Sequence, residues 1–304
     1  MTQLSPPATV ESLLAAGRAR IDVRLEALAS QLEGEHPGQV GMALGYALRS
    51  PGKRVRPALV LAAYRAAGGM ASAIDGVATA VEVVHTYSLV HDDLPCMDDD
   101  ATRRGRPTTH VVFGVDTATR VGWLLVPVAV EALTRAAVDL GLGNPRLATM
   151  GAVLLEASGI RGMVGGQWLD LAGEGRQVGL DGLRAIHGAK TGALIQASCQ
   201  LGGMAAGAST AVAEALSTYG RELGLAYQVA DDLLDATATS MQLGKTAGRD
   251  AVLSKSTYVG ELGIAGARRE ADALAGRAVE ALERAGLSTP DLVGLARYVV
   301  TRTF

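Results

Sequence analysis

The chain has 304 residues, with 28 lysines and arginines against 31 aspartates and glutamates, for a formal net charge of −3 at pH 7. This balance excludes the strongly basic surface that is typical of nucleic-acid binding. Two cysteines, Cys96 and Cys199, are too few for a disulfide framework and are typical of a protein in a reducing cytoplasm.

Helical periodicity dominates the sequence, whereas alternating β-branched runs between turns are scarce. Apolar residues recur at three- and four-residue spacing, which indicates amphipathic α-helices. A final helix is expected to begin at Pro290, because Thr289 before it can act as a cap. The other predicted helices, in chain order, cover residues 10–32, 38–49, 57–67, 73–93, 117–140, 147–166, 180–188, 191–206 and 211–235.

The connections between these helices are short. The clearest break, residues 141–145, has the length of a helix connection rather than of a domain linker. We therefore predict an all-α fold in which residues 1–304 form one domain, an antiparallel helical bundle around a central cavity.

No segment predicts stable insertion into a membrane. The most apolar run, residues 121–130, contains Pro127 and is far shorter than the roughly 20 residues that span a bilayer. The first residues lack the basic start and apolar core of a signal peptide. We expect a cytoplasmic protein.

Aspartates are crowded at the end of the helix predicted over residues 73–93. Five of them lie between Asp92 and Asp100, and Pro95 should end the helix at about Asp93 or Leu94. The helix macrodipole disfavours a carboxylate at that end by roughly 0.3–1 kcal/mol. A divalent cation reverses this effect, and ligands that are all oxygen suit Mg²⁺, which commonly also holds substrate phosphates. For this stretch alone, an acidic surface loop is the alternative.

A second acidic cluster lies on the helix predicted over residues 211–235. Gln228, Asp231, Asp232 and Asp235 fall at i, i+3, i+4 and i+7, on one face of an otherwise apolar helix. Burying three like charges without a counter-ion costs several kcal/mol. This cluster therefore indicates the same kind of cationic partner as the first.

Basic residues recur near these clusters. Lys53, Arg54 and Arg56 lie on a proline-flanked turn at a helix start, which suits either phosphate binding or a solvated turn. His85 lies on the same predicted helix face as Asp92, about 10 Å away, but a lone histidine is often only a core residue.

Isolated lysines and a glycine-rich segment leave two interpretations open. Lys190, Lys245 and Lys255 could supply positive charge to a diphosphate, although each alone suits the surface. Residues 162–167 indicate either a tight helix contact or a segment that faces a ligand.

Together these motifs resemble the trans-isoprenyl diphosphate synthases, the polyprenyl synthetase family. The two signatures are the run from Asp92-Asp93 to Asp98 with Arg103-Arg104 behind it, and the run from Asp231-Asp232 to Asp235. Further matches, in family order, are segments 52–57, 166–167, 190–192, 244–245 and 255–258.

The resemblance implies roles for these residues in a magnesium-dependent prenyltransferase. Magnesium would be bound by the carboxylates of Asp92, Asp98 and Asp231, supported by Asp93, Asp232 and Asp235. Catalysis would rest on Arg103, Lys190 and Lys245 together with the aspartates Asp92, Asp93, Asp98, Asp231 and Asp232. The allylic diphosphate would be held by Arg103, Lys190, Lys245 and Lys255, with Thr191 and Gln228 nearby. Isopentenyl diphosphate would be held by Lys53, Arg56, His85 and Arg104.

The implied reaction needs no protein nucleophile. The allylic diphosphate leaves as an anion, the double bond of isopentenyl diphosphate attacks the resulting carbocation, and the released diphosphate takes up the final proton. A homodimer is also implied.

The expected product is farnesyl diphosphate. In this family the residues five and four before the first aspartate help to form the cavity floor, and these are the bulky Tyr87 and then Ser88. Geranylgeranyl diphosphate is the alternative product. Ala101 and Trp123 depart from residues that are frequent in the family, and the departure at Trp123 bears on chain length and assembly.

Two other functions compete with this one. A class I terpene cyclase also ionises a prenyl diphosphate, but it would leave the basic turn at Lys53 to Arg56 unexplained. A non-catalytic subunit of a heteromeric synthase is expected to have lost acidic residues, whereas both clusters are complete here.

Overall fold

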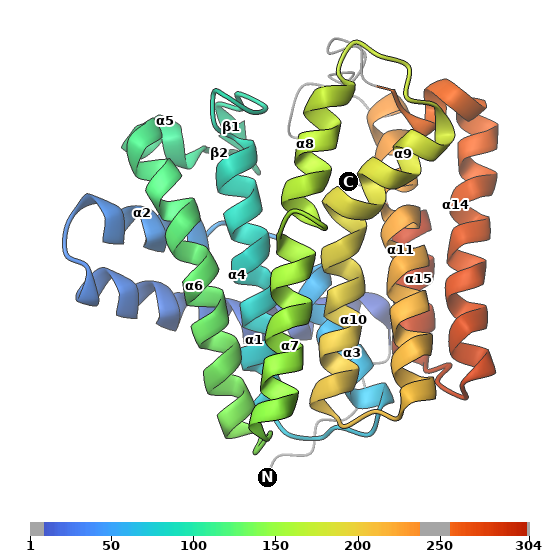
Figure 1. The fold of residues 1–304 in the computed structure, drawn as a ribbon, viewed down its shortest axis with the longest axis horizontal. Helices are drawn as coiled ribbons and strands as arrows, with labels where there is room; N and C mark the ends of the chain where they lie inside the picture. Colours follow the sequence, from blue (N-terminus) through green and yellow to red (C-terminus); the bar gives the residue numbers. More distant parts are fainter. Residues whose placement is uncertain (1–8, 238–255, 303–304) are drawn as a thin grey trace.

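The computed structural model describes residues 9–237 and 256–302. The described chain is a bundle of α-helices with a single short hairpin, which confirms the predicted all-α fold (Figure 1). The helices are α1 (Val10–Glu35), α2 (Gln39–Leu48), α3 (Val55–Ala66), α4 (Ile74–Asp92), α5 (Thr109–Phe113), α6 (Val115–Asp139), α7 (Asn144–Ser158), α8 (Met163–Gly173), α9 (Gly179–His187), α10 (Ala193–Ala205), α11 (Thr210–Thr237), α14 (Tyr258–Arg284) and α15 (Pro290–Thr301). A π-helical turn, η1 (Gly188–Gly192), joins α9 to α10, and strands β1 (Thr102–Arg103) and β2 (Arg106–Pro107) form the hairpin.

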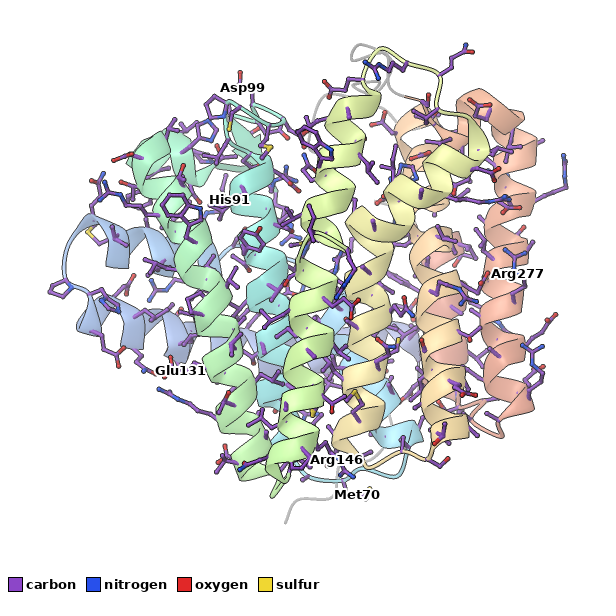
Figure 2. The ribbon with its side chains drawn as sticks, in the orientation of Figure 1. Met70, His91, Asp99, Glu131, Arg146 and Arg277 are labelled. Carbon is purple, nitrogen blue, oxygen red and sulfur yellow. The ribbon has the colours of Figure 1, made fainter. Side chains whose placement is uncertain are left out.

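The long helices lie side by side, and both acidic clusters belong to the same end of the bundle. Helices α4 and α11 run upward in Figure 1, so their C-terminal ends meet the upper surface. Figure 2 shows Asp99 at this end, whereas Arg146 and Met70 lie at the opposite end. The ends of α4 and α11, which are far apart in sequence, therefore lie at the same end of the bundle.

Two apolar clusters form the core. One gathers around α4, α6 and α7 and includes Val81, Leu125 and Leu154. The other gathers around α11, α14 and α15 and includes Leu274 and Leu292. Each fully buried leucine stabilises the fold by roughly 1.5–3 kcal/mol, so these clusters fix the positions of the helices that carry the acidic residues.

The capping and proline signals that predicted the start of α15 and the end of α4 agree with the structure. The Thr289 side chain accepts a hydrogen bond from the Leu292 amide, and Pro290 is the first residue of α15. Helix α4 ends at Asp92, ahead of Pro95.

The prediction of one continuous helix over residues 147–166 is wrong. The chain breaks into α7 and α8, and Gly159 and Gly162 at the break have non-helical backbone angles. Glycine adopts such angles without a Cβ penalty, so it allows this interruption. Helix α8 can then approach η1 closely.

Within residues 9–237 and 256–302, two segments are long and apolar enough to cross a membrane by length and composition alone, Val115–Asp139 and Asn144–Gly173. Core helices of soluble proteins meet the same criterion, so this finding is weak evidence for a membrane segment. Helix α6 contains Pro127 within its length.

Candidate active site

The loop after α4 folds back onto the helix end. The Asp98 amide donates to the Asp92 carbonyl at 2.9 Å, and the Asp100 amide donates to the Asp93 carbonyl at 3.2 Å. The loop thus satisfies carbonyl groups that the helix leaves without intrahelical partners. This fold-back brings Asp98 to the same end of α4 as Asp92 and Asp93.

The first two aspartates of this cluster are poorly solvated. Burial raises the pKa of Asp92 to about 6, and the negative charges of Asp98 and Asp170 oppose its ionisation further, while Lys190 and Arg103 favour it. Burial likewise raises the pKa of Asp93 to about 6, although Arg103 opposes the shift. A cation bound beside such poorly solvated carboxylates stabilises their charged form.

The hairpin presents Arg103 to these aspartates. Arg103 pairs with Arg106 across the strands, and the turn residues Arg104 and Gly105 both have positive φ, as two-residue hairpin turns require. The Arg103 guanidinium donates to Asp93 at 2.6 Å and to Asp100 at 3.2 Å. The hairpin therefore carries a cation into the first acidic cluster.

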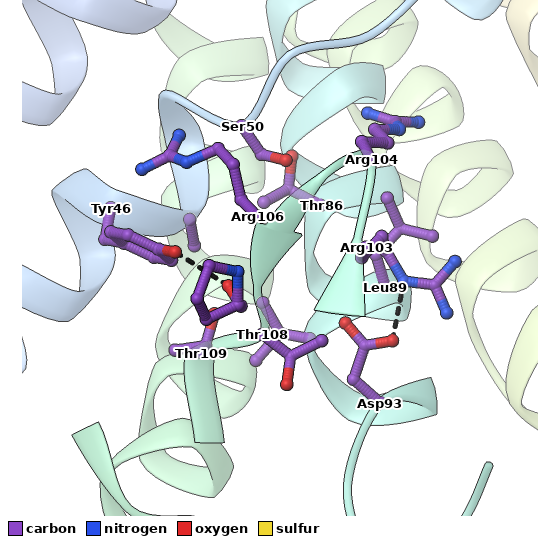
Figure 3. A pocket seen from close by; sticks show the side chains of 13 residues that line it. Tyr46, Ser50, Thr86, Leu89, Asp93, Arg103, Arg104, Arg106, Thr108 and Thr109 are labelled. Carbon is purple, nitrogen blue, oxygen red and sulfur yellow. Dashed lines mark hydrogen bonds and ion pairs between the residues drawn. The ribbon is translucent and has the colours of Figure 1, made fainter. Parts of the chain in front are cut away.

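A pocket with an empty volume of about 430 Å³, open to solvent, lies between α2, α4 and the hairpin (Figure 3). Tyr46 closes one side, where its hydroxyl donates to the Pro107 carbonyl at 2.7 Å and the Arg106 guanidinium lies 4.3 Å from its ring centroid. Asp93 and Arg103 line the other side. The pocket thus shares a wall with the first acidic cluster.

Within the second cluster, Asp232 faces the protein. One of its carboxylate oxygens accepts from the Gln228 amide at 3.2 Å, and the other accepts from the Tyr258 backbone amide at 2.8 Å. Tyr258 is the first residue of α14, so Asp232 binds the positive end of that helix. These two hydrogen bonds hold the Asp232 carboxylate between α11 and the start of α14.

Asp231 is nearly half exposed and pairs with Arg302, which sequence reasoning did not single out. The Arg302 guanidinium donates to Asp231 at 2.6 Å and to the Tyr227 carbonyl at 3.2 Å, and it stacks 3.6 Å from the Tyr227 ring centroid. Burial and the charge of Arg302 lower the pKa of Lys53, while Asp231 opposes this shift. The basic turn, the second acidic cluster and the end of α15 therefore lie together.

The π-helical turn lies between the two acidic clusters. Lys190 donates to Asp170 of α8 at 2.6 Å, and its charge also acts on Asp92. The next residue, Thr191, donates to Gln228 of α11 at 3.1 Å. Gly166 permits this arrangement, because a Cβ there would lie 2.1 Å from the Lys190 backbone nitrogen. This explains the glycine-rich segment as a close helix contact.

Asp170 was missed by sequence reasoning, whereas Gln167 was named only as part of the glycine-rich segment 162–167 and of the family match at 166–167. A single aspartate on an amphipathic helix resembles a surface residue, and only its i+3 spacing from Gln167 could have drawn attention to it. Gln167 is 7% exposed, and neither of its amide atoms has a hydrogen-bond partner among the described residues. Both residues extend the polar lining beside Lys190.

Two predicted diphosphate ligands, Arg56 and Arg104, converge on a ring nitrogen of a third, His85. The guanidinium groups of Arg56 and Arg104 lie 3.3 and 3.4 Å from Nε2 of His85. Because guanidinium groups only donate, Nε2 is the acceptor. Burial, followed by the charges of Arg56 and Arg104, lowers the pKa of His85 well below its usual value. His85 is therefore neutral, and the two arginines keep further N–H groups for an anion.

The acidic residues fit a hydrated divalent cation better than a closed metal site. Oδ1 of Asp235 is buried without a hydrogen-bond partner among the described residues. Across residues 9–237 and 256–302, no three acidic, histidine or cysteine side chains form a ready metal cluster. Magnesium is commonly held by one or two carboxylates, water and substrate phosphate, so this sparse donor set suits it. Lys245 and Lys255 lie outside the described residues.

The sequence model of the polyprenyl synthetase family matches residues 39–285. The chain belongs to the polyprenyl synthetase family. It is 44% identical over 255 residues to farnesyl diphosphate synthase of Escherichia coli, covering 83% of this chain and 85% of the relative. It is 42% identical over 252 residues to the heterodimeric geranylgeranyl pyrophosphate synthase large subunit 1 of Arabidopsis thaliana, covering 82% of this chain and 68% of the relative.

A solved member of the polyprenyl synthetase family shares the fold along almost its whole length. The structure of geranyltransferase from Helicobacter pylori, complexed with magnesium and isoprenyl diphosphate, has a TM-score of 0.79 and 31% identity, covering 98% of each chain. The chain described here is a short-chain trans-isoprenyl diphosphate synthase, a prenyltransferase that condenses isopentenyl diphosphate with allylic diphosphates. Prenyltransferases of this family use a divalent metal.

Proposed function

We propose that this polyprenyl synthetase uses Mg²⁺ and makes farnesyl diphosphate. Asp92 and Asp98 hold the metal at the first acidic cluster and Asp231 holds it at the second, with Asp93 and Asp235 completing the two sets. When bound, Mg²⁺ supplies positive charge that stabilises the departing diphosphate. The observation that carries this proposal is the pair of aspartates at the end of α4, Asp92 half-buried and Asp93 buried, where burial raises the pKa of each to about 6.

The allylic diphosphate lies on the side of Lys190. Arg103 and Lys190 donate to its oxygens, Lys245 and Lys255 add charge, and Thr191 and Gln228 line the adjoining wall. The bond between the allylic carbon and the diphosphate oxygen breaks, and its electron pair stays with the diphosphate. The cations stabilise the negative charge of this leaving group. Asp232 acts indirectly, by fixing Gln228 and the start of α14.

Isopentenyl diphosphate lies on the side of Lys53. Its phosphate oxygens accept hydrogen bonds from Lys53, Arg56 and Arg104, while neutral His85 orients the two arginines. The double bond is thereby held beside the allylic carbon and attacks it as the leaving group departs. The released diphosphate accepts the proton that the new product loses.

The product length depends on the wall below the first aspartates. Tyr87 is half-buried one turn before His91 and meets that ring edge-on, with the centroids 5.0 Å apart. Ser88 is buried, and its hydroxyl donates to the His85 carbonyl. The bulk of Tyr87 favours a floor that stops elongation at farnesyl diphosphate.

The whole chain acts as a single domain within a cytoplasmic homodimer. Helix α7 contacts both α6 and α8, and exposed apolar side chains lie on α6 (Trp123, 65%), on α8 (Trp168, 67%) and in the break between α7 and α8 (Ile160, 76%) (Figure 1). An apolar surface built from these side chains would suit a subunit contact. Sedimentation should give twice the mass of the chain, and Trp168→Ser should shift the protein toward monomer. A wild-type monomer would contradict this assembly.

The reaction is tested by incubating purified protein and Mg²⁺ with labelled isopentenyl diphosphate and, separately, dimethylallyl, geranyl or farnesyl diphosphate. We expect farnesol to dominate after dephosphorylation and chromatography. Geranylgeraniol as the main product would retain the reaction and overturn the Tyr87 floor. Cyclic hydrocarbons, or no condensation with any primer, would favour the cyclase or the non-catalytic subunit.

A further inference from the structure

Arg54 stands within the basic turn, but its guanidinium is bound by protein groups. Its side chain is 4% exposed, while its backbone adopts the left-handed conformation at φ 51° as the residue that precedes α3. A non-glycine residue in this conformation is strained. Something in the surrounding structure must therefore hold Arg54 there.

Three groups from different parts of the chain bind the Arg54 guanidinium. It donates at 2.8 Å to Asp22 of α1, to Glu82 of α4 and to the Ser50 carbonyl. Glu82 is 2% exposed, so its charge is satisfied within the protein. The ion pair thus fastens the basic turn to α1 and α4 at once.

Glu82 lies one helical turn before His85, the residue on which Arg56 and Arg104 converge. Gly52 in the turn is enclosed by two arginines, because a Cβ there would lie 2.6 Å from a terminal nitrogen of Arg104 and 3.1 Å from one of Arg54. A shift of Arg54 would therefore move the turn against Arg104.

We propose that Arg54 and Glu82 are positioning residues for the isopentenyl diphosphate subsite, where their buried ion pair sets the placement of Lys53, Arg56 and Arg104. This inference rests on the proposed assignment of those residues to isopentenyl diphosphate. Neither Arg54 nor Glu82 touches the substrate, and both act through the turn and His85.

Two effects of neutralising Glu82 have opposite signs. Removing a negative charge near a diphosphate subsite would by itself tighten anion binding. Releasing Arg54 from its ion pair would relax the left-handed turn and displace the cations, which weakens binding. The second effect should prevail, because hydrogen bonds to phosphate depend on direction as well as on charge.

The test is the pair of KM values for Glu82→Gln, which preserves shape and removes the charge. We expect KM for isopentenyl diphosphate to rise about tenfold, the equivalent of one lost charge-assisted hydrogen bond. KM for geranyl diphosphate should stay within about twofold, and kcat at saturation should be retained. A fall in KM for isopentenyl diphosphate, or an equal change in both KM values, would overturn the inference.

Asp75→Asn is the matched control, because Asp75 is a buried carboxylate on the same helix, bound to Arg20 of α1 at 3.1 Å. It should lower Tm while leaving both KM values unchanged. If Glu82→Gln does not fold, Asp22→Asn replaces it, since Asp22 is 47% exposed. Asp22→Asn should raise KM for isopentenyl diphosphate by less than about tenfold and leave KM for geranyl diphosphate unchanged. An unchanged KM for isopentenyl diphosphate would overturn the inference.

Arg56→Gln separates failure of this inference from failure of the subsite assignment. If Arg56→Gln raises KM for isopentenyl diphosphate and Glu82→Gln does not, only the positioning role is wrong. If Arg56→Gln leaves that KM unchanged, the assignment itself is wrong and the inference falls with it.

Discussion

Arg302 closes the end of α15 onto Asp231, with the guanidinium 2.6 Å from the carboxylate. The Arg302 side chain is 3% exposed and also stacks on Tyr227, so it is fixed from two sides. A residue close to the C-terminus thereby supplies a cation to an aspartate of the second acidic cluster. The last helix is consequently tied to the proposed metal site.

Replacing Arg302 should destabilise the metal-free protein. Arg302→Gln removes a charge-assisted hydrogen bond and a cation–π contact, for a loss of about 1–2 kcal/mol in the free energy of unfolding. The loss should shrink with Mg²⁺ and inorganic diphosphate present, because a bound cation then offsets the charge of Asp231. Urea unfolding with and without metal measures both values. Exposed Arg297 of α15 is the control, and an equal loss in both conditions would count against this account.

Asp92→Ala should abolish turnover without unfolding the chain. The substitution removes a proposed metal ligand at the buried end of α4, and kcat should fall by at least about 10³-fold. Asp116→Ala, at a side chain that is 89% exposed on α6, should leave kcat unchanged. Circular dichroism checks the fold of both variants. Near-normal kcat in folded Asp92→Ala would remove Asp92 from the metal site.

Tyr87→Ala should lengthen the product. The substitution removes a half-buried ring beside His91 and opens space below the first aspartates, so geranylgeranyl diphosphate should form from geranyl diphosphate. Chromatography of the dephosphorylated products measures the ratio of farnesol to geranylgeraniol. Ser88→Ala changes little volume and should leave this ratio unchanged. The same ratio in Tyr87→Ala and wild type would show that another residue limits elongation.

His85 predicts a specific loss of stability in acid. The pKa of His85 is lowered in the folded protein, so below the ordinary value of 6.5 the unfolded chain binds a proton that the folded chain excludes. The free energy of unfolding therefore falls by up to about 1.4 kcal/mol for each pH unit below 6.5, and this loss is absent at pH 8. Urea midpoints of wild type and His85→Gln between pH 5 and 8 should therefore diverge only on the acid side. Parallel curves would contradict a neutral His85.

Gly166→Ala should destabilise the protein and displace Lys190. An added Cβ would lie 2.1 Å from the Lys190 nitrogen and 2.5 Å from its Cα, and backbone atoms cannot yield easily. We expect a loss of about 1–3 kcal/mol in the free energy of unfolding. Gly151→Ala is the control on α7, where no atom lies within 4 Å and alanine should stabilise the helix by about 0.5–1 kcal/mol. Similar effects of the two substitutions on Tm would contradict the close contact.

Features set by local chemistry could be predicted from the sequence. Pro95 predicts the end of α4, and Thr289 with Pro290 predicts the start of α15, because capping and proline geometry act within a few residues. The acidic spacing on α11 likewise follows from helix periodicity. The convergence of Arg56 and Arg104 on His85 required the fold, since three separate segments meet there.

Contacts between distant segments could not be predicted. Nothing local distinguishes Asp170 or Arg302 from surface residues, and their partners Lys190 and Asp231 lie 20 and 71 residues away. Sequence periodicity also gave no helix for α14. Its buried face consists largely of alanines, which give little contrast with the exposed face, so its position is determined by packing against α11.

The π-helical turn makes this part of the chain sensitive to its length. Substitutions at Lys190 or Thr191 change one side chain, but deleting a single residue between Gly188 and Gly192 would rotate everything on one side of the cut by about 100° relative to the other. Lys190 could then no longer reach Asp170 while Thr191 reaches Gln228. A one-residue gap here should therefore displace the neighbouring side chains far more than a substitution at a single position would.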